Sequence, residues 1–179
     1  RVTALFVWPD GRIGAISNER VWRDVADQQD HGLGPFSDAN GELQIHTAFA
    51  DSGGHLFLGS QRSLHRLEAG GSVLRHVARS RGPIDARNIA SSRINTIAER
   101  KLPAGAELIW SAFGQGCFSM DALDMEPVFA MTVHKDAGDH LVRKITVGPE
   151  GRIWLVGANK GLVEISSLEA SKDLIARYR

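Results

Sequence analysis

Apolar and polar positions alternate along short runs of the chain, and turn residues separate these runs. The stretch ITVGPEGRIWLVGANKGLVEI, residues 145–165, shows the arrangement. Gly148–Gly151 is a turn signal, Ile153–Val156 is a short apolar run, and Leu162–Ile165 alternates again after a second turn. Short apolar or alternating runs bounded by glycine, proline and asparagine are typical of β-strands. The stretch therefore predicts three strands joined by two turns, with Leu174–Tyr178 as a fourth strand.

The same order of strands and turns occurs four times. The units start at Val2, Ile45, Ile94 and Val142, which lie 43, 49 and 48 residues apart. Propeller blades are four-stranded sheets that repeat about every 40 to 50 residues. We therefore predict an all-β fold: a single β-propeller region over residues 1–179 with four blades. The approximate blade boundaries are 2–44, 45–93, 94–141 and 142–179.

The outermost strand of each blade is the weakest part of the pattern. Val73–Val77 and Val128–Val133 are the predicted fourth strands of the second and third units, and the first unit shows none clearly. Edge strands are often polar, which weakens their signal. The alternative fold is a β-sandwich of eight or more strands without repeats, but a sandwich would not repeat one strand order at a regular period.

Composition and charge exclude several classes of partner. Of the 179 residues, 42% are apolar, and 21 Lys plus Arg balance 21 Asp plus Glu. Nucleic-acid and anionic-membrane binders usually carry a basic excess, so we expect neither partner. The single cysteine excludes an internal disulfide, and no apolar run reaches the roughly 18 residues of a membrane span. Because Arg1 rather than Met opens the chain, we expect a longer parent polypeptide.

The histidines and acidic turns do not form a recognisable metal site. No pair has the His-x-x-x-His spacing of a zinc protease. His46 and His55 flank one predicted strand and turn, and are either ordinary strand histidines or a metal pair across a hairpin. Each acidic turn offers one carboxylate, whereas a calcium loop needs several ligands. We predict no metal and interpret as turns Asp10-Gly11, Asp51–Gly54 and Glu150-Gly151.

No enzyme motif is present. Cys117 lies in a strand pattern without a nearby histidine, which favours a buried free thiol over a nucleophile. Gly114–Gly116 is too short for a phosphate loop, and there is no G-x-S-x-G elbow. We predict neither catalysis nor a cofactor in this region.

The fourth unit carries a family resemblance. Gly151–Gly157, followed by Gly161-Leu162, resembles the repeat of two-component regulator propellers, approximately D-x-x-G-x-I-W-I-G-T-x-x-G-L. His31–Gly34 is similar to the family's glycine-leucine linker, but the first unit has Gly14 in place of tryptophan and the third contains an insertion. The resemblance implies a propeller of about seven blades, in the periplasmic or extracytoplasmic sensor of a dimeric bacterial membrane receptor. With four blades, the chain is a fragment of such a propeller, a closed four-bladed ring, or one of two copies that complement each other; we favour the fragment. Its kinase or cyclase output domain would lie outside the chain, and several such sensors resemble carbohydrate sensors.

A second family is similar over a shorter stretch. Residues 145–154 also resemble a blade of the streptogramin lyases, which carry a glutamate after the blade tryptophan and a catalytic His–Glu set with magnesium. Here Leu155, Val156 and Gly157 follow Trp154. The residues that would carry lyase activity are absent from this unit.

Aromatic residues recur in the second strands. Trp110 and Trp154 lie there, with Phe57 in the equivalent place of the second unit. We predict that they pack between blades. Stacking on a sugar ring at the channel mouth is the alternative.

The loops between second and third strands are the predicted binding site. A propeller gathers these loops on one face, so their polar side chains would surround a small polar ligand, such as an oligosaccharide. The alternatives are that the loops are polar because they face water, or that the chain is a protein-interaction scaffold with an exposed patch at Val128–Met131. The predicted ligand-binding residues are Asn18, Arg20, Gln61, Arg62, Gln115, Asn159 and Lys160.

Overall fold

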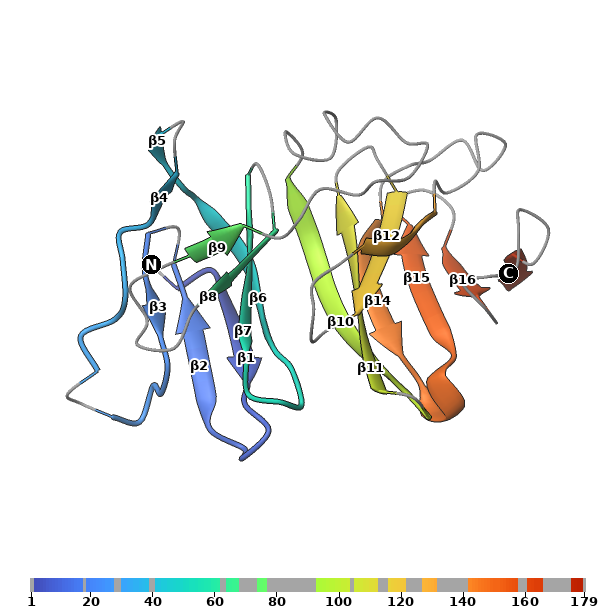
Figure 1. Ribbon diagram of the computed structural model, residues 1–179, viewed down its shortest axis with the longest axis horizontal. Helices are drawn as coiled ribbons and strands as arrows, with labels where there is room; N and C mark the ends of the chain where they lie inside the picture. The colour runs from blue at the N-terminus through green and yellow to red at the C-terminus, as the bar shows by residue number, and fades with distance from the viewer. Residues whose placement is uncertain are drawn as a thin grey trace.

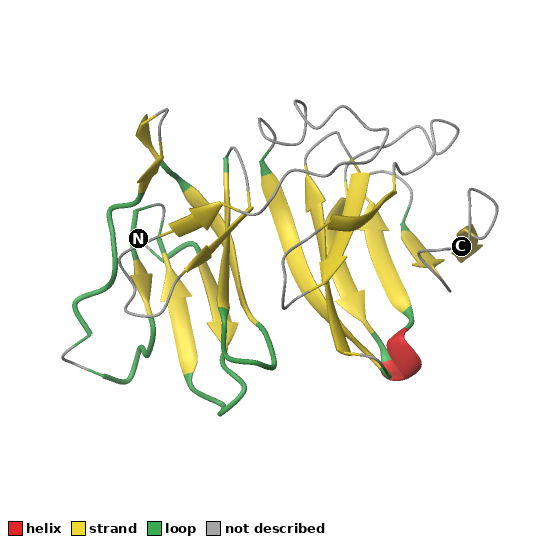
Figure 2. Ribbon diagram, in the orientation of Figure 1, coloured by secondary structure: helices red, strands yellow, loops and turns green. Residues whose placement is uncertain are grey.

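In its described residues the chain forms four antiparallel sheets of three or four strands that lie side by side, together with one two-stranded hairpin (Figures 1 and 2). The computed structural model describes residues 2–17, 19–27, 30–38, 41–61, 64–67, 74–76, 93–103, 105–112, 116–121, 127–131, 142–157, 161–165 and 175–178. In these ranges the regular structure is strand throughout, apart from one turn of 3₁₀ helix, η2 (Pro149–Gly151). The prediction of an all-β chain is confirmed.

Each sheet is a meander in which consecutive strands pair. The first sheet contains β1 (Ala4–Val7), β2 (Ile13–Ile16) and β3 (Val21–Trp22). The second contains β6 (Ile45–Ala50), β7 (Leu56–Ser60), β8 (Leu64–Leu67) and β9 (Leu74–His76). The third contains β10 (Ile94–Leu102), β11 (Gly105–Ala112), β12 (Gly116–Asp121) and β13 (Pro127–Met131). The fourth contains β14 (Val142–Val147), β15 (Ile153–Gly157), β16 (Leu162–Ile165) and β17 (Ile175–Tyr178). A small hairpin, β4 (Ser37–Asp38) and β5 (Gly41–Glu42), precedes the second sheet.

The sheets stack through their first strands. Strand β1 lies against β6, β6 against β10, and β10 against β14. The turns that follow these strands gather at one edge of the stack, the lower edge in Figure 1. First strands side by side, with the other strands of each sheet outside them, are the arrangement of propeller blades. The second to fourth sheets begin at Ile45, Ile94 and Val142, where the repeat units start; the exact domain division stays a prediction.

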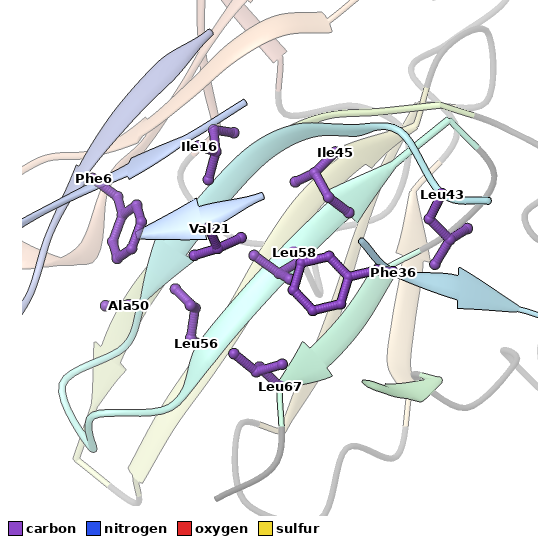
Figure 3. Close-up of a cluster of buried hydrophobic side chains, with 10 residues drawn as sticks. All are labelled: Phe6, Ile16, Val21, Phe36, Leu43, Ile45, Ala50, Leu56, Leu58 and Leu67. Carbon is purple, nitrogen blue, oxygen red and sulfur yellow. The ribbon is translucent and has the colours of Figure 1, made fainter. Parts of the chain in front are cut away.

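An apolar cluster holds the first two sheets together (Figure 3). Sheet one faces sheet two with Phe6, Ile16 and Val21, and the connecting segment adds Phe36 and Leu43. Burying each such side chain contributes about 1.5–3 kcal/mol, so this cluster is the main source of cohesion between these two sheets. The members from the second sheet are Ile45, Ala50, Leu56, Leu58 and Leu67.

Polar side chains join the third and fourth sheets. The amide of Asn95 and the hydroxyl of Ser111 both donate to the carbonyl oxygen of Val142, at 3.1 Å and 3.2 Å. The backbone amide of Ile145 donates to Oγ1 of Thr96 at 3.4 Å. Buried hydrogen bonds are directional, so they align the two sheets as well as holding them together.

Three of the first strands carry a β-bulge at the same place. The pairing with the second strand shifts between Ile45 and Thr47 in β6, between Ile94 and Thr96 in β10, and between Val142 and Lys144 in β14. A bulge leaves one extra residue unpaired in the ladder and redirects its side chain. The extra residues are His46, Asn95 and Arg143.

Counting from the bulge corrects one expectation about the aromatic residues. Ser60, Ala112 and Gly157 lie opposite the first residue of each bulge. Phe57 and Trp154 come three residues earlier, but Trp110 comes two residues earlier. Because neighbouring strand residues point to opposite faces, Trp110 lies on the other face of its sheet from the face that Phe57 and Trp154 occupy. The interpretation of all three as equivalent was wrong.

The tryptophan missing from the first unit is replaced across the strand pair. Gly14 pairs with Phe6, and the Phe6 ring lies where a side chain on Gly14 would be, so that a Cβ there would overlap its Cζ. An aromatic ring from one strand can cover a glycine on its neighbour and fill the space between sheets. The ring of Phe6 also packs edge-on against Trp8, with centroids 5.4 Å apart.

Candidate functional site

The stack has two edges with different chemistry. The turns between first and second strands, whose described residues are 8–12, 51–55, 103 and 148–152, form what we call the turn edge. The starts of the first strands form the opposite edge. Because Ile45 pairs with Ser60, the loops that follow the second strands begin at that same edge. We call it the bulge edge, and its residues are His46, Arg93, Asn95 and Arg143.

Two of the predicted binding residues lie in the described part of the chain, and both contact their own chain. A guanidinium nitrogen of Arg20 donates to the carbonyl oxygen of His31 at 3.2 Å. The side-chain amide of Gln61 accepts from Gln44 N at 2.7 Å and donates to Glu42 O at 3.1 Å. These bonds anchor local loops. The remaining five, Asn18, Arg62, Gln115, Asn159 and Lys160, lie outside the described residues, and ligand contact by all seven stays a prediction.

Apart from His46, which the sequence offered only as one of a candidate metal pair, the polar side chains of the bulge edge were not indicated by the sequence patterns. His46 and Asn95 are half-buried, and Arg93 and Arg143 are exposed. Asn95 links β10 to β14 through its bond to Val142, the residue before Arg143. Bulges are frequent next to functional sites because they redirect a side chain out of the ladder. The repetition of one bulge in three neighbouring strands makes this edge the candidate site.

The surroundings of His46 favour its neutral form over its protonated form. Its partial burial, and secondly the positive charge of Arg93, lower its pKa below the ordinary value of 6.5. Arg93 directly precedes β10, whereas His46 lies in β6, and these two strands of neighbouring sheets pack against one another. The neutral imidazole is thus the form that this edge favours.

Lowering the pH from 7 to 5 is expected to destabilise the protein in part through His46. Since the folded pKa lies below the unfolded one, the unfolded chain binds the proton more tightly. The stabilisation is therefore complete above the unfolded pKa and is lost as the pH falls through the folded pKa. Urea unfolding at pH 7, 6 and 5 should show a smaller loss for His46→Gln than for the original chain. His31→Gln, at an exposed position, is the control, and an equal pH slope in all three chains would contradict the expectation.

At the turn edge, three arginines are paired with carboxylates. Arg12 pairs with Asp10 at 2.7 Å, and Arg100 with Glu107 at 2.6 Å. Arg152 contacts both Glu150 and Glu164, at 3.5 Å and 3.3 Å. Each of these ion pairs links two parts of the same sheet, and the opposite charges of its two side chains cancel.

A buried aspartate organises the turn of the second sheet. Asp51 accepts from the backbone amide of His55 at 2.7 Å and contacts its Nδ1 at 2.9 Å. The hydroxyl of Ser52 donates to Glu99 of the neighbouring sheet at 2.8 Å. Ser52 is therefore held by Glu99, and the trio Ser52, His55 and Asp51 does not form the relay of a hydrolase. The sequence pattern predicted a turn here, but it did not reveal the Asp51–His55 pair.

The structure separates the two histidines considered as a metal pair. His46 lies in the bulge of β6, whereas His55 lies beside Asp51 at the opposite end of the same hairpin. Within the described ranges, no group of three or more His, Cys, Asp or Glu residues could hold a metal ion.

The aromatic residues divide into buried and partly accessible ones. Phe57 and Trp110 are buried between sheets, so neither presents a free face to a sugar. Trp154 is half-buried. Cys117 lies in β12 and Val128–Met131 in β13, but their side-chain surroundings lie outside the described residues. No helix in the described part of the chain is long and apolar enough to cross a membrane.

Solved structures with the same arrangement of strands are known. The extracellular domain of BT4673 from B. thetaiotaomicron, assigned as a hybrid two component system, matches with a TM-score of 0.68 and 16% identity over 92% of this chain and 23% of its own. That of BT3049 from the same organism, also assigned as a hybrid two component system, matches with a TM-score of 0.64 and 14% identity over 95% of this chain and 22% of its own. The β-propeller domain of Cps50 (Swd1) from Myceliophteria thermophila has a TM-score of 0.64 and 11% identity, over 98% and 57%.

These similarities concern the fold. They confirm the prediction of an all-β propeller. The chain spans about a fifth of the length of the two extracellular domains. No family model and no curated protein matches the chain.

Proposed function

We propose that this chain is part of a non-catalytic sensor propeller of a bacterial two-component-type receptor, and that it binds a small polar ligand at the bulge edge. In the full receptor it would lie outside the cytoplasm, would pair with a second copy, and would pass its signal to an output domain. The observation that carries the ligand part is the repeated bulge, which places His46, Asn95 and Arg143 on neighbouring first strands. The similar extracellular domains of BT4673 and BT3049 support the sensor part.

The chemistry of the two edges supports binding without catalysis. At the turn edge, Asp51, Glu99 and Glu107 all bond to neighbouring side chains or amides, which leaves their carboxylates structural. At the bulge edge, His46, Asn95 and Arg143 lie on the first strands β6, β10 and β14, which pack against one another in that order. Several convergent polar groups on rigid strands suit the recognition of a polar molecule. A carbohydrate fits this description, and its hydroxyl groups can both donate and accept.

A thermal-shift panel of neutral and acidic mono- and oligosaccharides tests the ligand part. At least one member is expected to raise the melting temperature, because a ligand that binds only the folded state stabilises it. Asn95→Ala, at the bulge edge, should reduce that shift in melting temperature. Ser52→Ala, at the turn edge, is the control and should leave the shift unchanged. Unchanged melting temperatures and unchanged tryptophan fluorescence across the panel would refute ligand binding.

A protein-interaction scaffold is the second candidate, and an exposed apolar surface favours it. Leu5, Val7 and Ile13 of the first sheet are 64%, 61% and 45% exposed. In the pairing of first and second strands they occupy the positions that Ala48, Ala50 and Leu56 occupy in the second sheet. Those three residues pack the second sheet against the first. The partner that fits this surface is therefore a further blade from a second copy. Light scattering should then show dimers that Leu5→Lys abolishes; a monomer at all concentrations would exclude it.

A further inference from the structure

We propose that the ligand of the bulge edge is anionic, carrying a carboxylate or sulfate group that Arg93 and Arg143 bind. This inference rests on the proposed function, since it names the chemical class of ligand for the same site. It concerns charge only, and it does not depend on which sugar or other scaffold carries the anionic group.

The two arginines have no charge partner in the part of the chain that the structure describes. Both side chains are exposed, and no described carboxylate lies within ion-pair distance of either. Each occupies a position set by a rigid first strand: Arg93 directly precedes β10 and Arg143 is the bulge residue of β14. The paired strands fix the backbone at Arg143 and next to Arg93, which reduces the entropy that binding must overcome.

The turn edge shows what this fold does with basic side chains that have a structural role. There Arg12, Arg100 and Arg152 each contact at least one carboxylate of their own hairpin. The formal net charge of the chain is zero. The two edges therefore differ in where charged side chains are placed, and not because the chain has an excess of positive charge. An edge whose guanidinium groups have no carboxylate partner among the described residues attracts anions and orients them during approach.

The neighbouring side chains extend the positive edge into an arc. His46 lies in β6, which packs against β10, the strand that Arg93 directly precedes. Asn95 follows Arg93 by two residues and bonds to the residue before Arg143. The arc therefore runs His46, Arg93, Asn95, Arg143 across three sheets. A guanidinium can donate two parallel hydrogen bonds to a carboxylate or sulfate, a geometry that a neutral hydroxyl group cannot match.

Trigalacturonate and its fully methyl-esterified form test the inference, because they have the same sugar rings and differ in charge. Isothermal titration of the whole chain at constant ionic strength is expected to show binding of the acid at least about tenfold tighter than the ester, equivalent to about 1.4 kcal/mol. Arg93→Gln and Arg143→Gln should each weaken binding of the acid about tenfold and leave the ester unchanged. Arg152→Gln, at the turn edge, is the matched control and should change neither. Circular dichroism and melting temperature verify that every variant folds.

The outcomes separate the two proposals. Equal or tighter binding of the ester would overturn the anionic preference but leave the polar-ligand function standing. Binding of a neutral sugar from the thermal-shift panel, with no binding of trigalacturonate, would do the same. Weakening by Arg152→Gln equal to that by Arg143→Gln would show a general charge effect and would also overturn the site assignment. If no sugar of either kind binds, both proposals fail.

Discussion

Phe57→Ala is expected to lower the free energy of unfolding by about 3–5 kcal/mol, the range for truncating a buried phenylalanine. Phe57 is fully buried in β7. It points to the same side of the second sheet as Gly59, and there the third sheet approaches closely, because a Cβ on Gly59 would lie 2.7 Å from Cβ of Ile94. Such tight contact leaves little freedom for the surroundings to close over the cavity.

Urea unfolding followed by tryptophan fluorescence measures this change, and two variants support its interpretation. Phe57→Leu keeps most of the volume and should lose less than the alanine variant. Val25→Ala removes a side chain that is 53% exposed and should change stability by no more than about 0.5 kcal/mol. A loss below about 1 kcal/mol for Phe57→Ala would mean that the second and third sheets do not depend on one another as the contacts indicate.

Glu107→Gln is expected to be the second most damaging substitution, with a cost of about 3 kcal/mol. Glu107 in β11 pairs with Arg100 in β10 through two contacts, at 2.8 Å from Nε and 2.6 Å from Nη2. Their side chains are only 10% and 12% exposed. Neutralising one partner leaves the guanidinium with little water to replace the lost carboxylate charge, and this unpaired charge accounts for most of the cost.

A double-mutant cycle with Arg100→Met separates the pair from the general effect of substitution. The double variant should be more stable than the sum of the single changes predicts, because neither charge is then left alone. Glu150→Gln is the control, because Glu150 is 78% exposed and contacts Arg152 at 3.5 Å; such surface pairs contribute about 0–1 kcal/mol. Additive single changes at residues 100 and 107 would show that the two groups are independent.

The positions of these residues indicate how ligand binding at the bulge edge would affect the rest of the stack. Phe57 joins the second and third sheets near the middle of the stack, and the Arg100–Glu107 pair lies towards the turn edge. The bulge edge is at the other end of the same first strands. A ligand that bridges His46 and Arg143 would therefore act on strands that are packed along their length, and the sheets would respond together.

The sequence by itself determined the strands, the turns and the repeat. Alternation in Ile45–Ala50 and the turn signal at Gly148–Gly151 are local properties, because side-chain direction in a strand and glycine's backbone freedom depend on the residue and its neighbours. The first residues of the second to fourth sheets, Ile45, Ile94 and Val142, are the same in the pattern and in the structure for this reason.

The tertiary structure alone decided the candidate site and the faces of the sheets. A bulge exists only when two strands pair with unequal numbers of residues, so His46, Asn95 and Arg143 carry no local mark of their position. Trp110 lies on the opposite face from Trp154 because its register differs by one residue, and a single residue reverses every side chain. The pairing of Arg100 with Glu107 and the lack of a described partner for Arg143 likewise depend on which strands meet. Hydrophobic alternation specifies strands, whereas register and strand pairing decide which polar groups come together.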